Sequence, residues 1–336
     1  MADSPDTINK KLFANLLYEQ ARTSQFMLLG DSQHGDQNIT RLATNPLALQ
    51  SLARAGVKTL MLEHMTYEQP AFDALANGTI SKRQFVSLLD SSIALFGNRD
   101  APPEEQRKNA ILKRNMINDV ADTILSAKTN GIKVVAIDGM EGDYNRLYDL
   151  EHHKRTYQKA IDMARADPNL MITKGFYKNL TEQVADDMKQ DGSAATLSYK
   201  PKKRAQRSDL ENMDPFSQRM EMDHLTLAQR IFETAQGQPA AILYGGWHMA
   251  KVNDLDETLE RLHTEQADPK NPRRATSVIN IYDSPNGNGI KDIKGFCQDF
   301  DCAASPNHLN YYYRTSRMDT GNIGLKTEPA SPNAVP

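Results

Sequence analysis

The chain has 336 residues, of which 39% are hydrophobic, and a formal net charge of −3. This length allows one large α/β domain with insertions, or two smaller domains. Acidic and basic residues nearly balance, so no overall electric field favours nucleic acid or an anionic membrane as a partner. Because the sequence has no run of about 18 apolar residues, we expect no membrane span.

The first residues and the cysteines bear on the cellular setting. Residues 1–11 are polar and lack the apolar segment of a signal peptide. Cys297 and Cys302 form one late pair, which is neither a disulfide framework nor a four-ligand zinc site. We therefore expect a cytoplasmic protein, or one that is secreted into a host cell without a signal peptide.

The N-terminal part alternates between helical and strand-like patterns. Apolar residues at helical spacing predict a helix over residues 6–22, and the next apolar run, 25–29, predicts a buried strand. A second strand is predicted over 57–62, with Glu63 directly after it. Two strands joined by a helix within about 40 residues are typical of a βαβ unit, and such units form parallel sheets.

The helix between these two strands has recognisable ends. Asn45 and Pro46 have the pattern of an N-cap residue followed by a first-turn proline. Gly56 has the pattern of the residue that follows a helix C-terminus. The same criteria predict helices over 111–125, 144–166, 175–188, 219–235 and 255–263, and strands over 133–137, 240–244 and 277–282.

These elements predict an α/β fold: an open, mostly parallel sheet with helices on both faces, plus a helical insertion. Residues 1–24 are expected to form a helical lead-in, and residues 25–284 the core domain. The insertion, at about 144–215, includes the basic run Lys200–Arg204, which we interpret as a solvated loop. Residues 285–336 are expected to be an irregular, partly disordered tail, interrupted by Tyr311–Tyr313.

Polar residues follow four of the predicted strands. Ligands of open parallel sheets bind beyond the carboxyl ends of the strands. We therefore expect these acids and histidines to gather at one edge of the sheet. They are Asp31 and His34, Glu63 and His64, Asp138 and Glu141, and His248 after Gly245 and Gly246.

This cluster allows two routes to hydrolysis. It can bind a divalent cation (Mn, Zn or Co), with His34, Glu63 and His248 as ligands, which lowers the pKa of a bound water. Alternatively, a neutral histidine acts as general base on water and is oriented by Asp31 or Glu63. The neighbouring glycines can offer backbone N–H groups to an oxyanion.

Several of these residues also have structural interpretations. Asp31 can be a turn former or an N-cap, and Asp138-Gly139 is a common turn dipeptide. His64 can lie on the other face of its strand, and His152-His153 is interpreted as a solvated pair on a helix. His34 and His248 follow glycine-bearing strand ends and carry most of the functional hypothesis.

Three short blocks resemble the erythromycin esterase-like and ChaN-like proteins of the haem-binding-uptake and Tiki group. These blocks are Leu28–Asp36, Leu60–Glu63 and Tyr244–His248. The resemblance implies a parallel α/β core, with His34 or His248 as base or ligand and Asp31 and Glu63 as orienters or ligands. Members of the group include esterases, metal-dependent proteases, a haem-binding lipoprotein and virulence proteins.

The resemblance also has departures and extensions. Asp31 stands where the family has glutamate, so its shorter reach leaves its role open. The esterases use an arginine from a helix before the last block, and Arg219 is the candidate in this sequence. No lipobox cysteine lies near the N-terminus, which argues against a haem lipoprotein.

Two rival hypotheses remain open. Gly30-Asp31-Ser32 resembles the first block of SGNH (GDSL-type) esterases, with Ser32 as nucleophile, but the required Asp-x-x-His block is not near the C-terminus. The other is a binding protein or virulence effector that takes haem, a metal or a host protein. The main hypothesis is an ester or amide hydrolase that acts on a small molecule or peptide.

Overall fold

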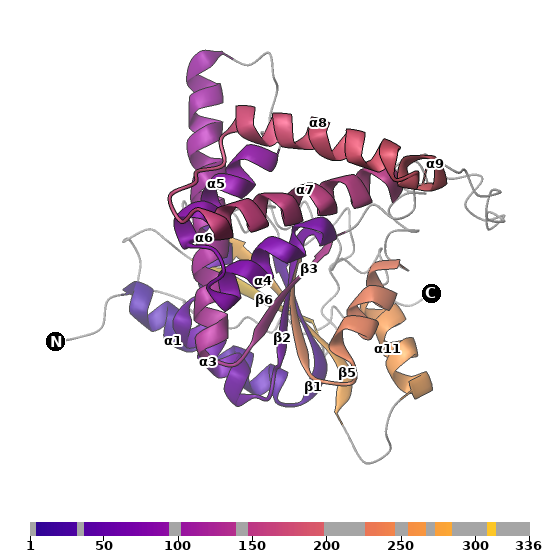
Figure 1. Cartoon of the computed structure of the whole chain (residues 1–336). Helices are drawn as coiled ribbons and strands as arrows, with labels where there is room; N and C mark the ends of the chain where they lie inside the picture. The colour runs from indigo at the N-terminus through magenta and orange to yellow at the C-terminus, as the bar shows by residue number, and fades with distance from the viewer. Residues whose placement is uncertain are drawn as a thin grey trace. The chain divides into compact units, whose positions relative to one another are not determined.

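A computed structural model of the chain describes residues 5–31, 37–93, 102–138, 147–197, 226–245, 255–266, 273–283 and 308–313. The described strands form a six-stranded sheet in the order β3-β2-β4-β1-β5-β6 (Figure 1). The pairs β1–β4, β1–β5, β2–β4 and β5–β6 are all parallel. The predicted α/β class with a mostly parallel sheet is therefore confirmed.

The strands begin and end close to where the apolar runs predict. Strand β1 spans Ser24–Asp31, β2 Thr59–Met65, β3 Lys133–Asp138, β4 Ala240–Gly245, β5 Arg274–Asp283 and β6 His308–Tyr313. All eight residues of β1 and all six of β4 are buried, as expected for central strands covered on both faces.

The chain divides into two compact units. The first, here called the sheet unit, consists of Met1–Glu63, Thr129–Ile137 and Arg219–Pro336. The second, here called the helical unit, consists of His64–Lys128 and Asp138–Gln218. The helical unit thus contains a segment before β3 as well as the whole region, about 144–215, where an insertion is expected.

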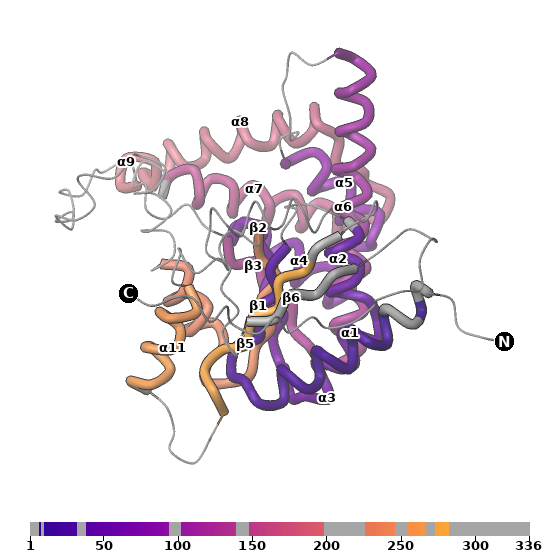
Figure 2. Tube along the Cα trace, turned by 180° about the vertical axis from the view of Figure 1, so that it is seen from behind, coloured from indigo at the N-terminus to yellow at the C-terminus, as the bar shows by residue number. Residues whose placement is uncertain are grey.

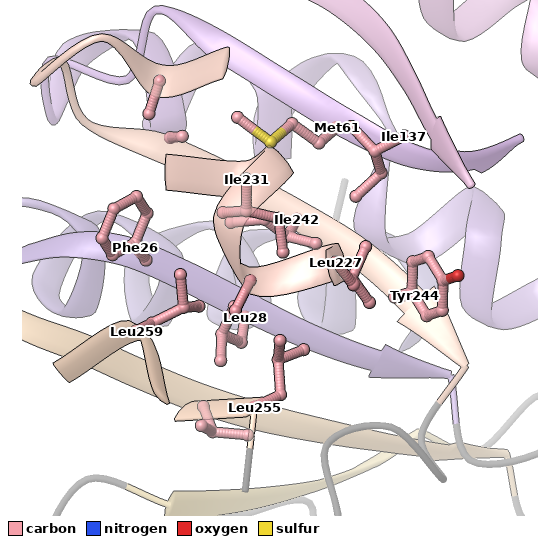
Figure 3. Close-up of a cluster of buried hydrophobic side chains, with 14 residues drawn as sticks. Phe26, Leu28, Met61, Ile137, Leu227, Ile231, Ile242, Tyr244, Leu255 and Leu259 are labelled. Carbon is pink, nitrogen blue, oxygen red and sulfur yellow. The ribbon is translucent and has the colours of Figure 1, made fainter. Parts of the chain in front are cut away.

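One face of the sheet is covered by the helical residues 226–235 and by α11, Leu255–Gln266. Their apolar side chains pack on Phe26 and Leu28 of β1 and on Ile242 and Tyr244 of β4. Figure 3 shows Phe26 and Tyr244 near opposite ends of this cluster. We call this side of the sheet the α11 face.

Helices α1, Pro5–Ala21, α2, Gln37–Ala43, and α3, Pro46–Arg54, lie on the opposite face (Figures 1 and 2). The ends of α3 follow from its sequence. Asn45 Oδ1 accepts hydrogen bonds from the backbone N–H groups of Leu47 and Ala48, at 3.0 and 3.2 Å. Gly56 adopts φ +94°, a conformation that favours glycine, directly before the turn into β2. The predicted caps of this helix are confirmed.

The helical unit is built from η1 and six helices that the structure describes. They are η1 Thr66–Glu68, α4 Gln69–Asn77, α5 Lys82–Ser92, α6 Pro103–Thr129, α7 Leu147–Ala166, α8 Lys174–Gln190 and α9 Ser193–Leu197. Helices α7 and α8 lie side by side (Figures 1 and 2). Gln84 of α5 donates to the carbonyls of Ala164 and Asp167, which ties α5 to the end of α7. No described helix is long and apolar enough to cross a membrane.

Strand β6 differs from the expectation that residues 285–336 are irregular. His308–Tyr313 pairs in parallel with β5, from Val278↔His308 to Asp283↔Tyr313. Aromatic residues such as Tyr311–Tyr313 favour strands. The Gly-, Asn- and Pro-rich sequence around them obscures this local preference.

The interpretation of His152 and His153 as a solvated pair is wrong. The Nε2 atom of His152 donates to the backbone oxygen of Thr181 at 2.8 Å, because α8 packs on α7. His153 stacks on Tyr67, with the ring centroids 4.8 Å apart and an angle of 25° between the planes. Helical periodicity alone does not reveal that α7 is covered on this side.

The burial of His153 predicts how the stability of the helical unit depends on pH. Burial, and next to it His152, hold the pKa of His153 below its ordinary value of 6.5, although Asp149 and Glu68 oppose this shift. The folded state therefore binds fewer protons than the unfolded state as the imidazole titrates. This contribution to stability is present above about pH 6.5 and is lost as the pH falls through the lower folded-state pKa.

We expect the His153→Phe variant, which keeps a ring against Tyr67, to lose less stability on acidification than the wild type. The measurement is the change in melting temperature between about pH 7.5 and about pH 5.5. His263→Phe, a substitution in α11 of the sheet unit, is the control and should behave like the wild type. An equal acid-induced loss in the wild type and in His153→Phe would contradict the assignment.

Candidate functional site

Three neighbouring strands bring polar groups together at their carboxyl ends, along one end of the sheet. Strand β4 lies between β2 and β1 in the sheet order. Asp31, the last residue of β1, is the register partner of Gly245, the last residue of β4. In β2, Leu62 pairs with Leu243, and Glu63 follows it. The carboxyl ends of β2, β4 and β1 therefore carry Glu63, Gly245 and Asp31 in neighbouring positions.

Glu63 is fixed by a hydrogen bond to the backbone of the adjacent strand. Its Oε2 atom accepts from the N–H group of Gly245 at 2.7 Å. The register between β2 and β4 ends at Leu62–Leu243, so the carboxylate takes an N–H group two residues beyond the last ladder pair. Hydrogen bonds to a charged group contribute about 1.5–3 kcal/mol, so this contact holds the side chain in one orientation.

Strand alternation separates Glu63 from Asp31. Met61 packs in the cluster on the α11 face, so Glu63, two residues later, lies on the same face. Phe26 and Leu28 also lie on that face, so Asp31, at odd spacing from them, lies on the opposite one. Asp31 is buried, with 7% of its surface exposed. The two carboxylates thus lie at the carboxyl ends of their strands but on different faces of the sheet.

An arginine approaches the same edge from the helix before β4. Arg230, in the helical residues 226–235, donates from Nη1 to the backbone oxygen of Ile137, near the end of β3. Leu227 and Ile231 of this helix pack on the α11 face, where Glu63 lies. The sequence predicts Arg219 for this role. Arg230 lies nearer the strand in sequence and carries the contact that the structure describes.

Other predicted site residues fall outside the described residues. These are His34, His248, Arg219, Ser32 and Glu141, and the same holds for the pair Cys297 and Cys302. Asp138 ends β3 and is partly buried. Among the residues that the structure describes, no group of three or more His, Cys, Asp or Glu side chains is arranged to hold a metal ion.

His64 has a structural partner in the helical unit. Its Nδ1 atom lies 2.7 Å from Oε2 of Glu68, a carboxylate with 2% of its residue surface exposed. Its ring also contacts the ring of Phe72, with centroids 5.4 Å apart. These contacts favour the interpretation of His64 as a residue that supports the start of the helical unit.

Comparisons with known proteins give little to add to this geometry. No family model and no curated protein matches the sequence. The chain is similar to a solved structure, the type III effector HopBA1, with a TM-score of 0.39 and 14% identity over 82% of this chain and 84% of that one. A likeness of this size carries no functional argument, and the resemblance to erythromycin esterase-like and ChaN-like proteins receives no support from these comparisons.

Proposed function

We propose that the chain is a hydrolase of ester or amide bonds, with its active site at the carboxyl ends of β2, β4 and β1. The observation that carries this proposal is the hydrogen bond from Gly245 N–H to Glu63 Oε2. It fixes an acid where open parallel sheets bind their ligands. Glu63 is the acid that shares the α11 face with Tyr244.

The histidines complete the proposed chemistry. His34 follows Asp31 by three residues, and His248 follows Gly245 by three. In the proposed reaction one imidazole takes a proton from water as the water oxygen attacks the carbonyl carbon. The same proton then passes to the departing oxygen or nitrogen as the acyl bond breaks. Glu63 orients this imidazole, and Arg230 offers positive charge near the developing oxyanion.

A divalent metal is compatible with the same residues. One carboxylate and two imidazoles form a donor set that Zn²⁺, Mn²⁺ or Co²⁺ accepts, so Glu63, His34 and His248 would hold the ion. Such an ion lowers the pKa of a bound water and polarises the substrate carbonyl. The backbone N–H of Gly245 would then orient Glu63 as a ligand.

The test uses the full chain with p-nitrophenyl acetate and p-nitroacetanilide as probes. Both are assayed after chelation and again with Mn²⁺, Zn²⁺ or Co²⁺ added. We expect hydrolysis above the buffer rate, lost in the His248→Asn variant and retained in the Ser32→Ala variant. Hydrolysis that disappears in Ser32→Ala and survives in His248→Asn would instead support the SGNH-type mechanism.

A virulence effector is the second candidate, and it is compatible with a hydrolytic site. The solved structure reported above is described as a type III effector. Because the likeness carries no argument, it only indicates which experiment to run. A reporter fused to the chain should enter host cells from bacteria with a functional type III system. Retention of the fusion inside the bacteria would count against this candidate.

A further inference from the structure

The terminal row of residues on the α11 face runs across four strands. Gly30 of β1 is the register partner of Tyr244 in β4 and of Asn280 in β5. Glu63 extends this row on β2, since it follows Leu62, the partner of Leu243. We call Glu63, Tyr244, Gly30 and Asn280 the terminal row. It reaches from Glu63, the carboxylate proposed to orient the imidazole, to Asn280 of β5.

Asn280 brings a buried amide to this row. Its residue is 9% exposed, and its Oδ1 atom is buried with no hydrogen-bond partner among the described residues. A buried acceptor without a partner costs about 1–3 kcal/mol. Such a group in a folded protein calls for a specific explanation, and a ligand that donates the missing hydrogen bond is one.

Gly30 contributes no side chain to the terminal row beside Asn280. The preceding residues of β1 on this face, Phe26 and Leu28, are large and fully packed in the core. At Gly30 the row has no side chain, between the phenol of Tyr244 and the amide of Asn280. Glycine inside a strand is typical of a site where a ligand approaches the backbone closely.

We propose that Asn280 recognises the substrate by accepting a hydrogen bond from one of its N–H or O–H groups. This inference rests on the proposed function, because the terminal row places Asn280 relative to Glu63. Neighbouring strands lie about 4.8 Å apart, so β4, where Glu63 is anchored, and β5 lie about 10 Å apart. The preferred substrate is therefore an ester or amide with a donor group about 10 Å from the bond that is hydrolysed.

A second buried amide provides a matched control. Gln25 of β1 is 2% exposed, and its amide oxygen and nitrogen also have no partner among the described residues. It lies at the amino end of the sheet, one residue after the start of β1. A change at Gln25 tests what the loss of a buried strand amide does to the protein away from the proposed site.

The kinetic test compares two p-nitrophenyl esters of similar length. The ester of N-acetyl-8-aminooctanoic acid carries an N–H donor at the required distance, and p-nitrophenyl decanoate carries none. Asn280→Ala should lower kcat/KM for the first ester about tenfold and leave the second unchanged. Asn280→Asp keeps an acceptor oxygen in a side chain of the same shape, so it should keep most of the preference for the ester that carries the N–H donor. Gln25→Leu should leave the ratio of the two kcat/KM values unchanged.

A binding test separates this inference from the proposed hydrolysis. Saturation-transfer NMR measures binding of N-butylacetamide, which the protein does not need to hydrolyse. Signals that are present with wild type and Gln25→Leu but lost with Asn280→Ala support the inference, even if neither ester is hydrolysed and the proposed function fails. Equal binding of N-butylacetamide to wild type and Asn280→Ala overturns the inference. So does hydrolysis by Asn280→Ala with the same ratio of kcat/KM for the two esters as in the wild type, and this result leaves the proposed hydrolysis standing.

Discussion

The Glu63→Gln variant should lose at least about 100-fold in kcat/KM for the ester that the wild type hydrolyses fastest, with little change in stability. The amide oxygen of glutamine can still accept from Gly245 N–H, so the side chain keeps its anchor. What it loses is the negative charge that orients an imidazole or binds a metal ion. Steady-state kinetics and a melting curve on the same preparation measure the two effects.

A matched control for this variant lies in the same unit. Glu260 of α11 accepts a hydrogen bond from Thr276 Oγ1 at 3.1 Å. Thr276 lies near the start of β5, at the amino ends of the strands and away from the proposed site. Glu260→Gln makes the same chemical change there and should leave kcat/KM at the wild-type level. Wild-type activity in Glu63→Gln would remove Glu63 from the mechanism.

Lys113→Met should destabilise the helical unit by about 3 kcal/mol, the largest stability effect that we expect from a single polar side chain. Lys113 of α6 is 4% exposed, and its Nζ donates to the backbone oxygens of Asp90 and Ile93 at 2.6 and 2.7 Å. It also lies 3.3 Å from the Asp90 carboxylate. The ammonium thus satisfies the carbonyls at the C-terminus of α5, where the helix dipole favours positive charge.

The cost of this substitution comes from the groups that remain. Methionine fills the space of the lysine stem but leaves two carbonyls without their donor. Burial lowers the pKa of Lys113, and Asp90 partly opposes this shift, so the charged form depends on these contacts. Urea unfolding, followed with hydrogen exchange of the α5 amides, measures the loss.

Lys82 offers the comparison for this prediction. Its Nζ lies 2.6 Å from Asp122 Oδ1, and 38% of its side chain and 64% of that of Asp122 are exposed. Exposed ion pairs contribute about 0–1 kcal/mol, so Lys82→Met should be nearly neutral. Similar losses in the two variants would show that the burial of Lys113 has no special role.

The sequence predicts most of the sheet because its central strands are short, continuous apolar runs. β1 and β4 are buried throughout, and Asn45, Pro46 and Gly56 mark the ends of α3 by local rules alone. Helices α4 and α5 are not among the predicted elements, although Ser81 and Gln84 form a capping box at the start of α5, a signal that the sequence itself carries. Strand β6 is not predicted because the residues around it dominate the local composition.

The site is less predictable because it depends on register between distant segments. The strand-end rule indicates Glu63 and Asp31, but their faces depend on the pairing of β2 and β1 with β4, more than 170 residues away from either strand in sequence. Asn280 is not predicted either, because a single asparagine in an apolar strand forms no motif. The sequence does carry a signal for Arg230, since it lies on the predicted helix that leads into β4.

The most direct test of the proposed active site is a crystal structure of the full chain soaked with Mn²⁺ or Zn²⁺. We predict that the imidazoles of His34 and His248 converge with the Glu63 carboxylate around one ion or one water at the end of β4. The bound ion would give an anomalous signal within about 2.0–2.3 Å of its ligands. Imidazoles more than about 10 Å apart, too far to share one ion or one water, would contradict the account.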